Sequence, residues 1–257
     1  MFRHTLRLDR LPLLVTGVAL LLYFPSSYWE LSSKPGSGMT QGLAPYLAIL
    51  LAVVWAAPML AREFETGTSV WAWTQGTTRS RWFFSRAALP ILAAVVSGLA
   101  LTGAVMVSGM HRPVFVAHDH MSEAYLSTHG PYLVLSSLCA IATGLAAAAA
   151  TRRAVPAIGI SLIAQIAMTL LMPKLATSIA PTTTATFGRT VSDYQIAVLD
   201  GHQTSVTRLA DGGTAVEYQA NSHFWEAQLV TGAVFLALTA LLLAYAWRTV
   251  RTLPGKA

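Results

Sequence analysis

Side chains that could bind a metal ion gather between two apolar segments, where the sequence places His111, His118, Asp119 and His120. Zinc uses imidazole and carboxylate ligands of this kind. Histidines in an exposed polar loop, however, more often share no ion, so we expect no metal site. The single cysteine, Cys139, lies inside an apolar run and has no second cysteine with which to form an internal disulfide.

The sequence offers no residues for chemistry on a nucleotide or inside a membrane. Gly255 and Lys256 lack the upstream glycine and the downstream Ser or Thr of a phosphate-binding loop. No Asp, Glu, Lys, Arg or His lies in the middle of a long apolar stretch, which argues against proton-driven transporters and voltage-gated channels. We therefore expect a protein that is not an enzyme, has no cofactor of its own, and takes any energy from another chain.

One polar stripe interrupts the apolar stretches. Ser161, Gln165 and Thr169 recur every four residues and so share one face of a helix. An amide such as that of Gln165 is costly against lipid and should face protein or water. The stripe is therefore either contact between helices of the bundle or the wall of a substrate pathway, and these two interpretations stay open.

These residues must be positioned by membrane-spanning helices. Hydrophobic residues make up 54% of the chain and charged residues only 11%, against about 25% in soluble domains. Because a helix needs about 20 apolar residues to span a bilayer, we predict an all-α membrane protein whose single transmembrane domain, residues 1–257, has six spans. They are Leu11–Tyr28, Leu43–Leu60, Ala87–Met110, Pro131–Ala150, Val155–Met172 (bounded by Pro156 and Pro173) and Phe224–Trp247. We interpret the first stretch as a retained span rather than a cleaved signal peptide.

The distribution of basic residues predicts the orientation. Of the 17 Lys and Arg residues, 12 lie in the N-terminus, the 61–86 loop, the 151–154 turn and the C-terminus. The positive-inside rule places these segments, and hence both ends of the chain, in the cytoplasm. The net charge of +6 is divided among short runs between spans, a pattern that indicates membrane orientation rather than nucleic-acid binding.

The cytoplasmic loop Arg62–Arg86 has an unusual composition. Glu63 and Glu65 suit the start of a helix, and aromatic residues follow at helical spacing before Gly76 interrupts the pattern. We predict a helix over Glu63–Thr74 and a second helix that is capped by Thr77 or Thr78 and continues into the third span. An amphipathic helix that only lies on lipid is the alternative.

The long outer loop, Lys174–Ser222, changes character. It contains short β-like segments separated by Asp–Gly turns, at Tyr194–Leu199, Ser205–Leu209 and Thr214–Tyr218. We expect a small extracellular β-meander between spans five and six.

Three stretches together resemble the permease subunits of bacterial ATP-binding-cassette (ABC) transporters of the type-2 exporter class. One is the inner loop, through Glu63, Gly67, Thr68, Trp73, Thr78, Arg79, Arg81 and Trp82. The others are Arg152–Ala157, between spans four and five, and Tyr218–Trp225, which leads into the last span. The chain departs from the family in one respect: the family often has a longer amphipathic helix before the first span, and Met1–Arg10 is short.

The resemblance implies a multi-pass protein of the cell membrane that acts as a pair of permeases, homodimeric or heterodimeric. Each pair binds two cytoplasmic ATPase subunits, which hold the Mg-ATP, and the inner loop becomes the coupling helix. The acidic-Ala-Ala signature of importer permeases is absent, which favours export. We expect the coupling residues to be Glu63, Phe64, Glu65, Gly67, Thr68, Trp71, Trp73 and Arg79, and the substrate pathway to include Ser161, Gln165 and Thr169.

The expected function is the transmembrane half of an ABC exporter. Its substrate should be amphipathic or hydrophobic, because the spans carry few polar groups. The alternative is a non-transporting membrane scaffold or sensor subunit whose outer loop binds a ligand. An ATPase partner would distinguish the two.

Overall fold

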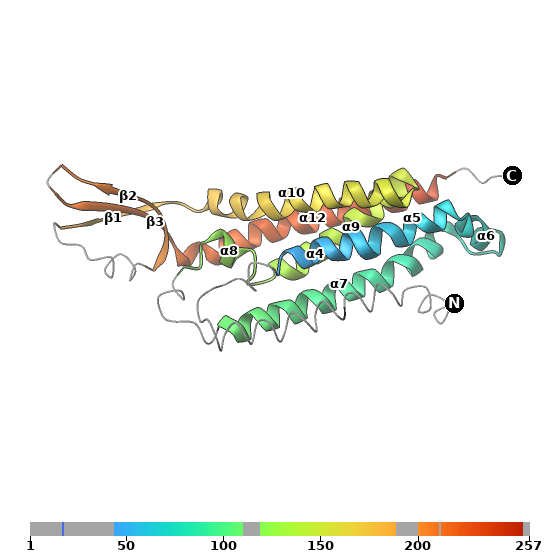
Figure 1. Ribbon diagram of the computed structural model, residues 1–257, viewed down its shortest axis with the longest axis horizontal. Helices are drawn as coiled ribbons and strands as arrows, with labels where there is room; N and C mark the ends of the chain where they lie inside the picture. The colour runs from blue at the N-terminus through green and yellow to red at the C-terminus, as the bar shows by residue number, and fades with distance from the viewer. Residues whose placement is uncertain (1–16, 18–43, 110–118, 189–199, 211, 254–257) are drawn as a thin grey trace.

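The computed structural model describes Gly17 and residues 44–109, 119–188, 200–210 and 212–253 of the 257-residue chain. Most of these residues are helical and form an elongated bundle with a small sheet at one end (Figure 1). The predicted first span, Leu11–Tyr28, lies outside the described residues except for Gly17, which is helical.

In the described part of the chain, four helices are long and apolar enough to cross a bilayer. They are α7 (Arg79–Gly109), α9 (Tyr132–Thr151), α10 (Ala154–Ile179) and α12 (Phe224–Arg251). These helices correspond to the predicted third to sixth spans, so the prediction of a mostly helical, multi-pass membrane protein is confirmed.

The predicted end of the fifth span is wrong, because α10 continues through Pro173 to Ile179. Pro173 has no N–H to donate to the preceding turn, yet the helix continues past it. At the end of the helix the side chain of Gln219 supplies donors. Its Nε2 donates to the carbonyl oxygens of Thr177 and Ala180 at 2.7 and 3.2 Å. A contact from β3 (Thr214–Ala220) of the sheet thus supports the last turn of α10.

The predicted second span is a continuous helical run in three parts. It comprises α4 (Tyr46–Leu50), the π-helical segment η1 (Leu51–Ala56) and α5 (Ala57–Glu65). Pro58 accounts for the irregularity, since it has no N–H to donate to the preceding turn and its ring crowds the carbonyl of Val54. In η1, the backbone N–H of Ala57 donates to the carbonyl oxygen of Ala52 instead.

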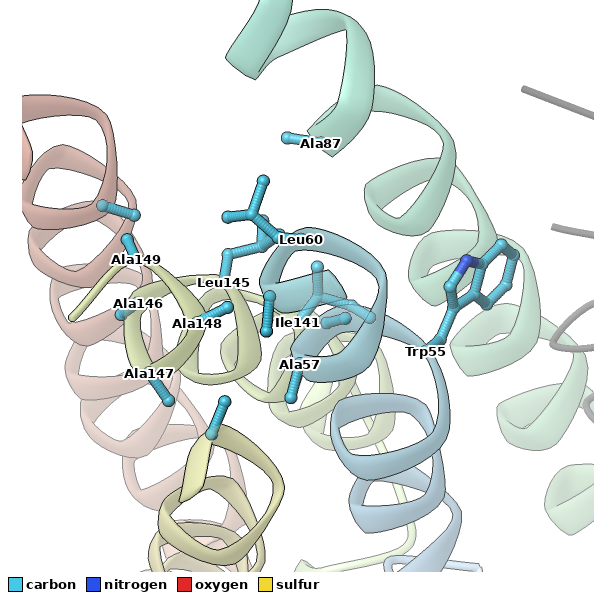
Figure 2. Packing of buried hydrophobic residues seen from close by; sticks show 14 of the residues in the cluster. Trp55, Ala57, Leu60, Ala87, Ile141, Leu145, Ala146, Ala147, Ala148 and Ala149 are labelled. Atoms are coloured by element: carbon cyan, nitrogen blue, oxygen red, sulfur yellow. The ribbon is translucent and has the colours of Figure 1, made fainter. Parts of the chain in front are cut away.

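The centre of the bundle is α9, which packs against α5, η1, α7, α10 and α12. Of its most apolar 18 residues, 78% are buried, compared with 22% for α10. Small side chains allow this density, and the alanines from Ala146 to Ala149 face neighbouring helices (Figure 2). Gly144 lets the backbones of α9 and η1 approach closely, since a Cβ there would lie 2.6 Å from that of Ala56.

The outer loop forms a three-stranded antiparallel sheet of order β1-β3-β2. Its strands are β1 (Thr183–Phe187), β2 (Gly201–Arg208) and β3 (Thr214–Ala220). The prediction of a small sheet is confirmed, and β2 and β3 overlap two of the predicted strands. β1 was not predicted, and the third predicted strand, Tyr194–Leu199, lies outside the described residues.

The two ends of the bundle carry different elements. The sheet and α8 (Glu123–Leu126) lie at one end, and α6 (Thr68–Thr74) lies at the other (Figure 1). The short η3 (Asn221–His223) joins β3 to α12. At its far end α12 meets the start of α7, where Trp247 Nε1 donates to Ser80 Oγ at 3.1 Å.

Candidate coupling site

The segment between α5 and α7 is a tight turn followed by a short helix. The turn closes where the Thr66 N–H and hydroxyl both donate to the carbonyl oxygen of Arg62, at 2.9 and 2.8 Å. Gly67 follows with φ of 71°, a left-handed conformation that glycine adopts without strain. The predicted single helix over Glu63–Thr74 is therefore wrong: Glu63 and Glu65 end α5, and a separate helix, α6, begins at Thr68.

The two carboxylates of this turn contact other helices of the same chain. Glu63 Oε1 lies 2.8 Å from Arg86 Nε, so that a largely buried ion pair joins α5 to α7. Glu65 Oε1 accepts a 2.8 Å hydrogen bond from the backbone N–H of Ala154, the first residue of α10. Both acids therefore have partners within the chain at the positions where we expected contacts with an ATPase.

Aromatic side chains fix α6 to the bundle. Trp82 of α7 is buried, and its ring centroid lies 5.7 Å from that of Phe64 and 5.5 Å from that of Trp73. Trp71 has no such cover: 67% of its surface is exposed. Thus one face of α6 packs on the protein, and the other presents a tryptophan outward.

Arg79 holds the start of α7 against the end of α12. Its Nη1 donates to the carbonyl oxygen of Arg251 at 3.0 Å and also to that of Leu253. The last carbonyls of a helix have no partner within it, so this side chain caps α12. Its guanidinium carbon also lies 5.0 Å from the centre of the Trp73 ring, which links α6 to the same junction.

The polar stripe on α10 faces the interior of the bundle. Ser161 and Gln165 are buried, and Gln165 Nε2 donates to Thr143 Oγ1 of α9 at 3.1 Å. Ser161 Oγ donates within its own helix to the carbonyl oxygen of Ala157, and Thr169 is half-buried. This geometry favours helix contact for Ser161 and Gln165, and their place on a substrate pathway stays a prediction.

A polar cluster at the sheet end includes two residues of the loop that we considered for metal binding. Asp119 Oδ1 lies 2.8 Å from His202 Nδ1, and the backbone N–H of His120 donates to Asn221 Oδ1. Within the described residues, no three His, Cys, Asp or Glu side chains are placed to hold a metal ion. His111 and His118 lie outside those residues.

Sequence reasoning found most of the turn but missed the groups that hold it. Arg86, the N–H of Ala154 and the carbonyl of Arg251 were not predicted, although each contacts a predicted residue. The only signal was general: in the predicted topology most arginines lie on one side of the membrane, beside the helix ends on that side. Such a signal cannot assign partners.

The comparisons with known proteins agree with the membrane architecture. A family model described as "ABC-2 membrane transporter related" matches residues 27–177, which include the predicted second span, α6 and all but the last two residues of α10. No curated protein and no solved structure matches the chain. The family match covers more than half of the sequence, including the inner loop and Arg152–Ala157, and confirms the resemblance to this class of permease. The chain belongs to the ABC-2 membrane transporter related family and is a permease subunit of that type.

Proposed function

We propose that the chain is the transmembrane subunit of an ABC exporter, which forms the substrate pathway and couples it to separate ATPase subunits. The observation that supports this most directly is the construction of α6. Trp73 and Phe64 brace it on buried Trp82, while Trp71 points outward with 67% of its surface exposed. A short, braced helix with one exposed aromatic residue is suited to dock a second protein and pass its movement on.

In the proposed topology the chain crosses the cell membrane six times, with both ends and α6 in the cytoplasm. The second span is the run Tyr46–Glu65, and the first is Leu11–Tyr28. The charges of the described residues support this orientation. Exposed arginines lie around the α6 end, at Arg62, Arg81, Arg152, Arg153, Arg248 and Arg251. Acidic residues lie near the sheet, at Asp119, Glu123, Asp200, Glu217 and Glu226.

The energy for export would come from partner subunits. We propose that two permease copies, identical or different, bind two cytoplasmic ATPases that hold Mg-ATP, and that this chain hydrolyses none. Within the coupling segment, Trp71 and Thr68 are exposed and would contact the ATPase. Gly67 would shape the turn. The other predicted coupling residues would support that surface from within the chain, namely Glu63, Phe64, Glu65, Trp73 and Arg79.

For the substrate pathway we propose the α10 side of the bundle. Only 22% of the most apolar 18 residues of this helix are buried within its own chain, which leaves it free to face a second permease or a substrate. Thr169 is the least buried member of the polar stripe. Ser161 and Gln165 would reach a substrate only if α10 turned away from α9.

Site-specific crosslinking tests the docking role of α6. In a Cys139→Ala background, Trp71→Cys should crosslink to an ATPase that co-purifies from the native membrane. Trp225→Cys is the matched control, because this tryptophan is 63% exposed at the sheet end. Substrate-stimulated ATP hydrolysis by the purified complex should accompany the crosslink. Co-purification without a crosslink at Trp71, or equal crosslinking at Trp225, would refute α6 as the docking element.

A non-transporting scaffold or sensor subunit stays the second candidate, because the sheet β1-β3-β2 gives the outer face a folded surface. The same purification distinguishes the two. A sensor should show no associated ATPase whose turnover responds to a transported compound.

A further inference from the structure

The start of α10 depends on a side chain that is distant in sequence. Arg152 is left-handed, with φ of 56°, and Arg153 is extended, so the chain turns sharply between α9 and α10. Arg153 occupies the N-cap position but makes no side-chain cap hydrogen bond. The first amides of a helix have no partner within it. Glu65 Oε1 supplies one for Ala154, 89 residues away in the chain.

This contact has favourable chemistry. A carboxylate at a helix N-terminus interacts well with the helix dipole, and a hydrogen bond to a charged acceptor is stronger than a neutral one. The N–H of Ala154 is the backbone group of this residue that lacks a partner within the helix, so a hydrogen bond to it fixes the first turn directly. Glu65 therefore does for α10 what a local Ser or Asp does at most helix starts.

The position of Glu65 in the chain gives the contact a second consequence. Glu65 is the last residue of α5, and the turn into α6 begins at the next residue. Any displacement of α6 is thus applied directly beside the cap. The neighbouring acid, Glu63, holds α7 through Arg86, so the two carboxylates connect the turn to two different spans.

Of the four long helices in the described residues, α10 and α12 are the least covered. Only 22% of the most apolar 18 residues of each helix are buried. The first turn of α10 shows the same exposure, since Val155 is 80% exposed beside the capped amide of Ala154. α9, with 78% buried, is surrounded by other helices and cannot shift without disturbing them. Displacement of the start of α10 would therefore disrupt fewer packing contacts than displacement of α9.

We propose that Glu65 is a positioning residue that transmits displacement of α6 to the start of α10. This proposal rests on the proposed coupling function and specifies one route by which movement of the ATPase reaches a span. The amide oxygen of glutamine can still accept the hydrogen bond, although without the charge the bond is weaker. Glu65→Gln should therefore retain much of the link, whereas Glu65→Ala should lose it.

The first measurement uses the purified chain alone. Amide hydrogen exchange should be about tenfold faster at Ala154 in Glu65→Ala, the loss expected for one capping hydrogen bond. Glu65→Gln should exchange at a rate between those of the wild type and Glu65→Ala, because its neutral amide oxygen accepts a weaker hydrogen bond. Glu226→Ala is the matched control, because Glu226 is an exposed helical carboxylate paired only locally, with His223. Unchanged exchange at Ala154 in Glu65→Ala would overturn the cap.

The second measurement tests transmission in the complex with the co-purified ATPase. A spin label at Val155→Cys, in a Cys139→Ala background, should change its spectrum when ATP is added. We expect the change to fall at least fivefold in Glu65→Ala, per bound ATPase, and to persist in Glu65→Gln and Glu226→Ala. This pattern separates the capping hydrogen bond from loss of a negative charge, because both control variants also remove a charge.

The outcomes separate this inference from the proposed function. An ATP response in Glu65→Ala equal to that of the wild type would overturn the transmission role and leave the exporter proposal standing. A wild-type complex that hydrolyses ATP without any response at Val155 would also overturn the transmission role and leave the exporter proposal standing. If no ATPase binds and Trp71→Cys forms no crosslink, the coupling function itself fails, and the transmission role fails with it.

Discussion

The contact between α9 and the second predicted span can be tested by adding a single methyl group. A Cβ at residue 144 would lie 2.6 Å from Ala56 Cβ, 2.9 Å from Ala57 N and 3.1 Å from Ala52 O. Two of these three atoms belong to the backbone and cannot rotate away. Gly144→Ala must therefore push α9 from η1 over part of its length.

The size of the effect follows from two opposing terms. Overpacking a close-packed core costs about 1–3 kcal/mol, and contacts with backbone atoms favour the upper end. Replacing glycine with alanine inside a helix recovers about 1 kcal/mol. The net loss is about 2 kcal/mol, which corresponds to a fall in Tm of about 4–8 °C in a domain of this size.

Thermal unfolding of the detergent-purified protein measures this difference. Gly103→Ala is the matched control, since Gly103 lies in α7 and an added Cβ there meets nothing within 4 Å. We expect the control to match the wild type or exceed it slightly, because alanine is the better helix former. If Gly144→Ala unfolds at or above the temperature of Gly103→Ala, then the close approach does not stabilise the bundle.

Three further predictions concern the turn, the polar stripe and the topology. Gly67→Val should cost about 1–2 kcal/mol, because L-residues resist the left-handed region, and should reduce the amount of co-purified ATPase. Gly67→Asn should retain it, and equal loss in both variants would point to side-chain bulk rather than backbone conformation. Gln165→Leu should lower Tm by about 2–4 °C by removing roughly 1 kcal/mol of contact with α9, while transport by the reconstituted complex changes little. A large loss of transport at unchanged Tm would instead place Gln165 on the substrate pathway. Finally, cysteines at Thr184 and Thr252 in a Cys139→Ala background should differ in intact cells: a membrane-impermeant thiol reagent should label the first and not the second. Equal labelling would contradict the proposed orientation.

The helices were largely predictable because their determinants are local. An apolar run of sufficient length must become a helix in lipid, so Pro131–Ala150 predicted α9 to within one residue at each end. The end of α10 was not predictable in this way. Pro173 resembles a stop signal, and the Gln219 side chain that supports the turns beyond it comes from the sheet. The sequence around Pro173 gives no indication of that contact, because Gln219 and Thr177 are 42 residues apart.

In the candidate coupling site, too, the local features were predictable and the tertiary contacts were not. The aromatic residues were recognised from composition and spacing, and Gly67 from the family resemblance. The structure brings Phe64 and Trp73 together on Trp82. The partners of Glu63 and Glu65 were not recognised, because the ion pair and the cap join residues that meet only when separate helices pack. A carboxylate before a turn is compatible with a partner protein or with its own chain, and only tertiary structure distinguishes them.

The π-helical segment has a consequence for insertions and deletions. A π turn amounts to one residue added to an α-helix, and each residue of an α-helix rotates the chain by about 100°. If Leu51–Ala56 lost one residue and became regular, α5 would keep its orientation, and Glu63 and Glu65 would still face Arg86 and Ala154. If it became regular without losing a residue, both acids would rotate away from their partners. A chain without this extra residue would therefore preserve the junction, and Leu51–Ala56 is the position in the predicted second span where the loss of one residue should leave the turn beyond it intact.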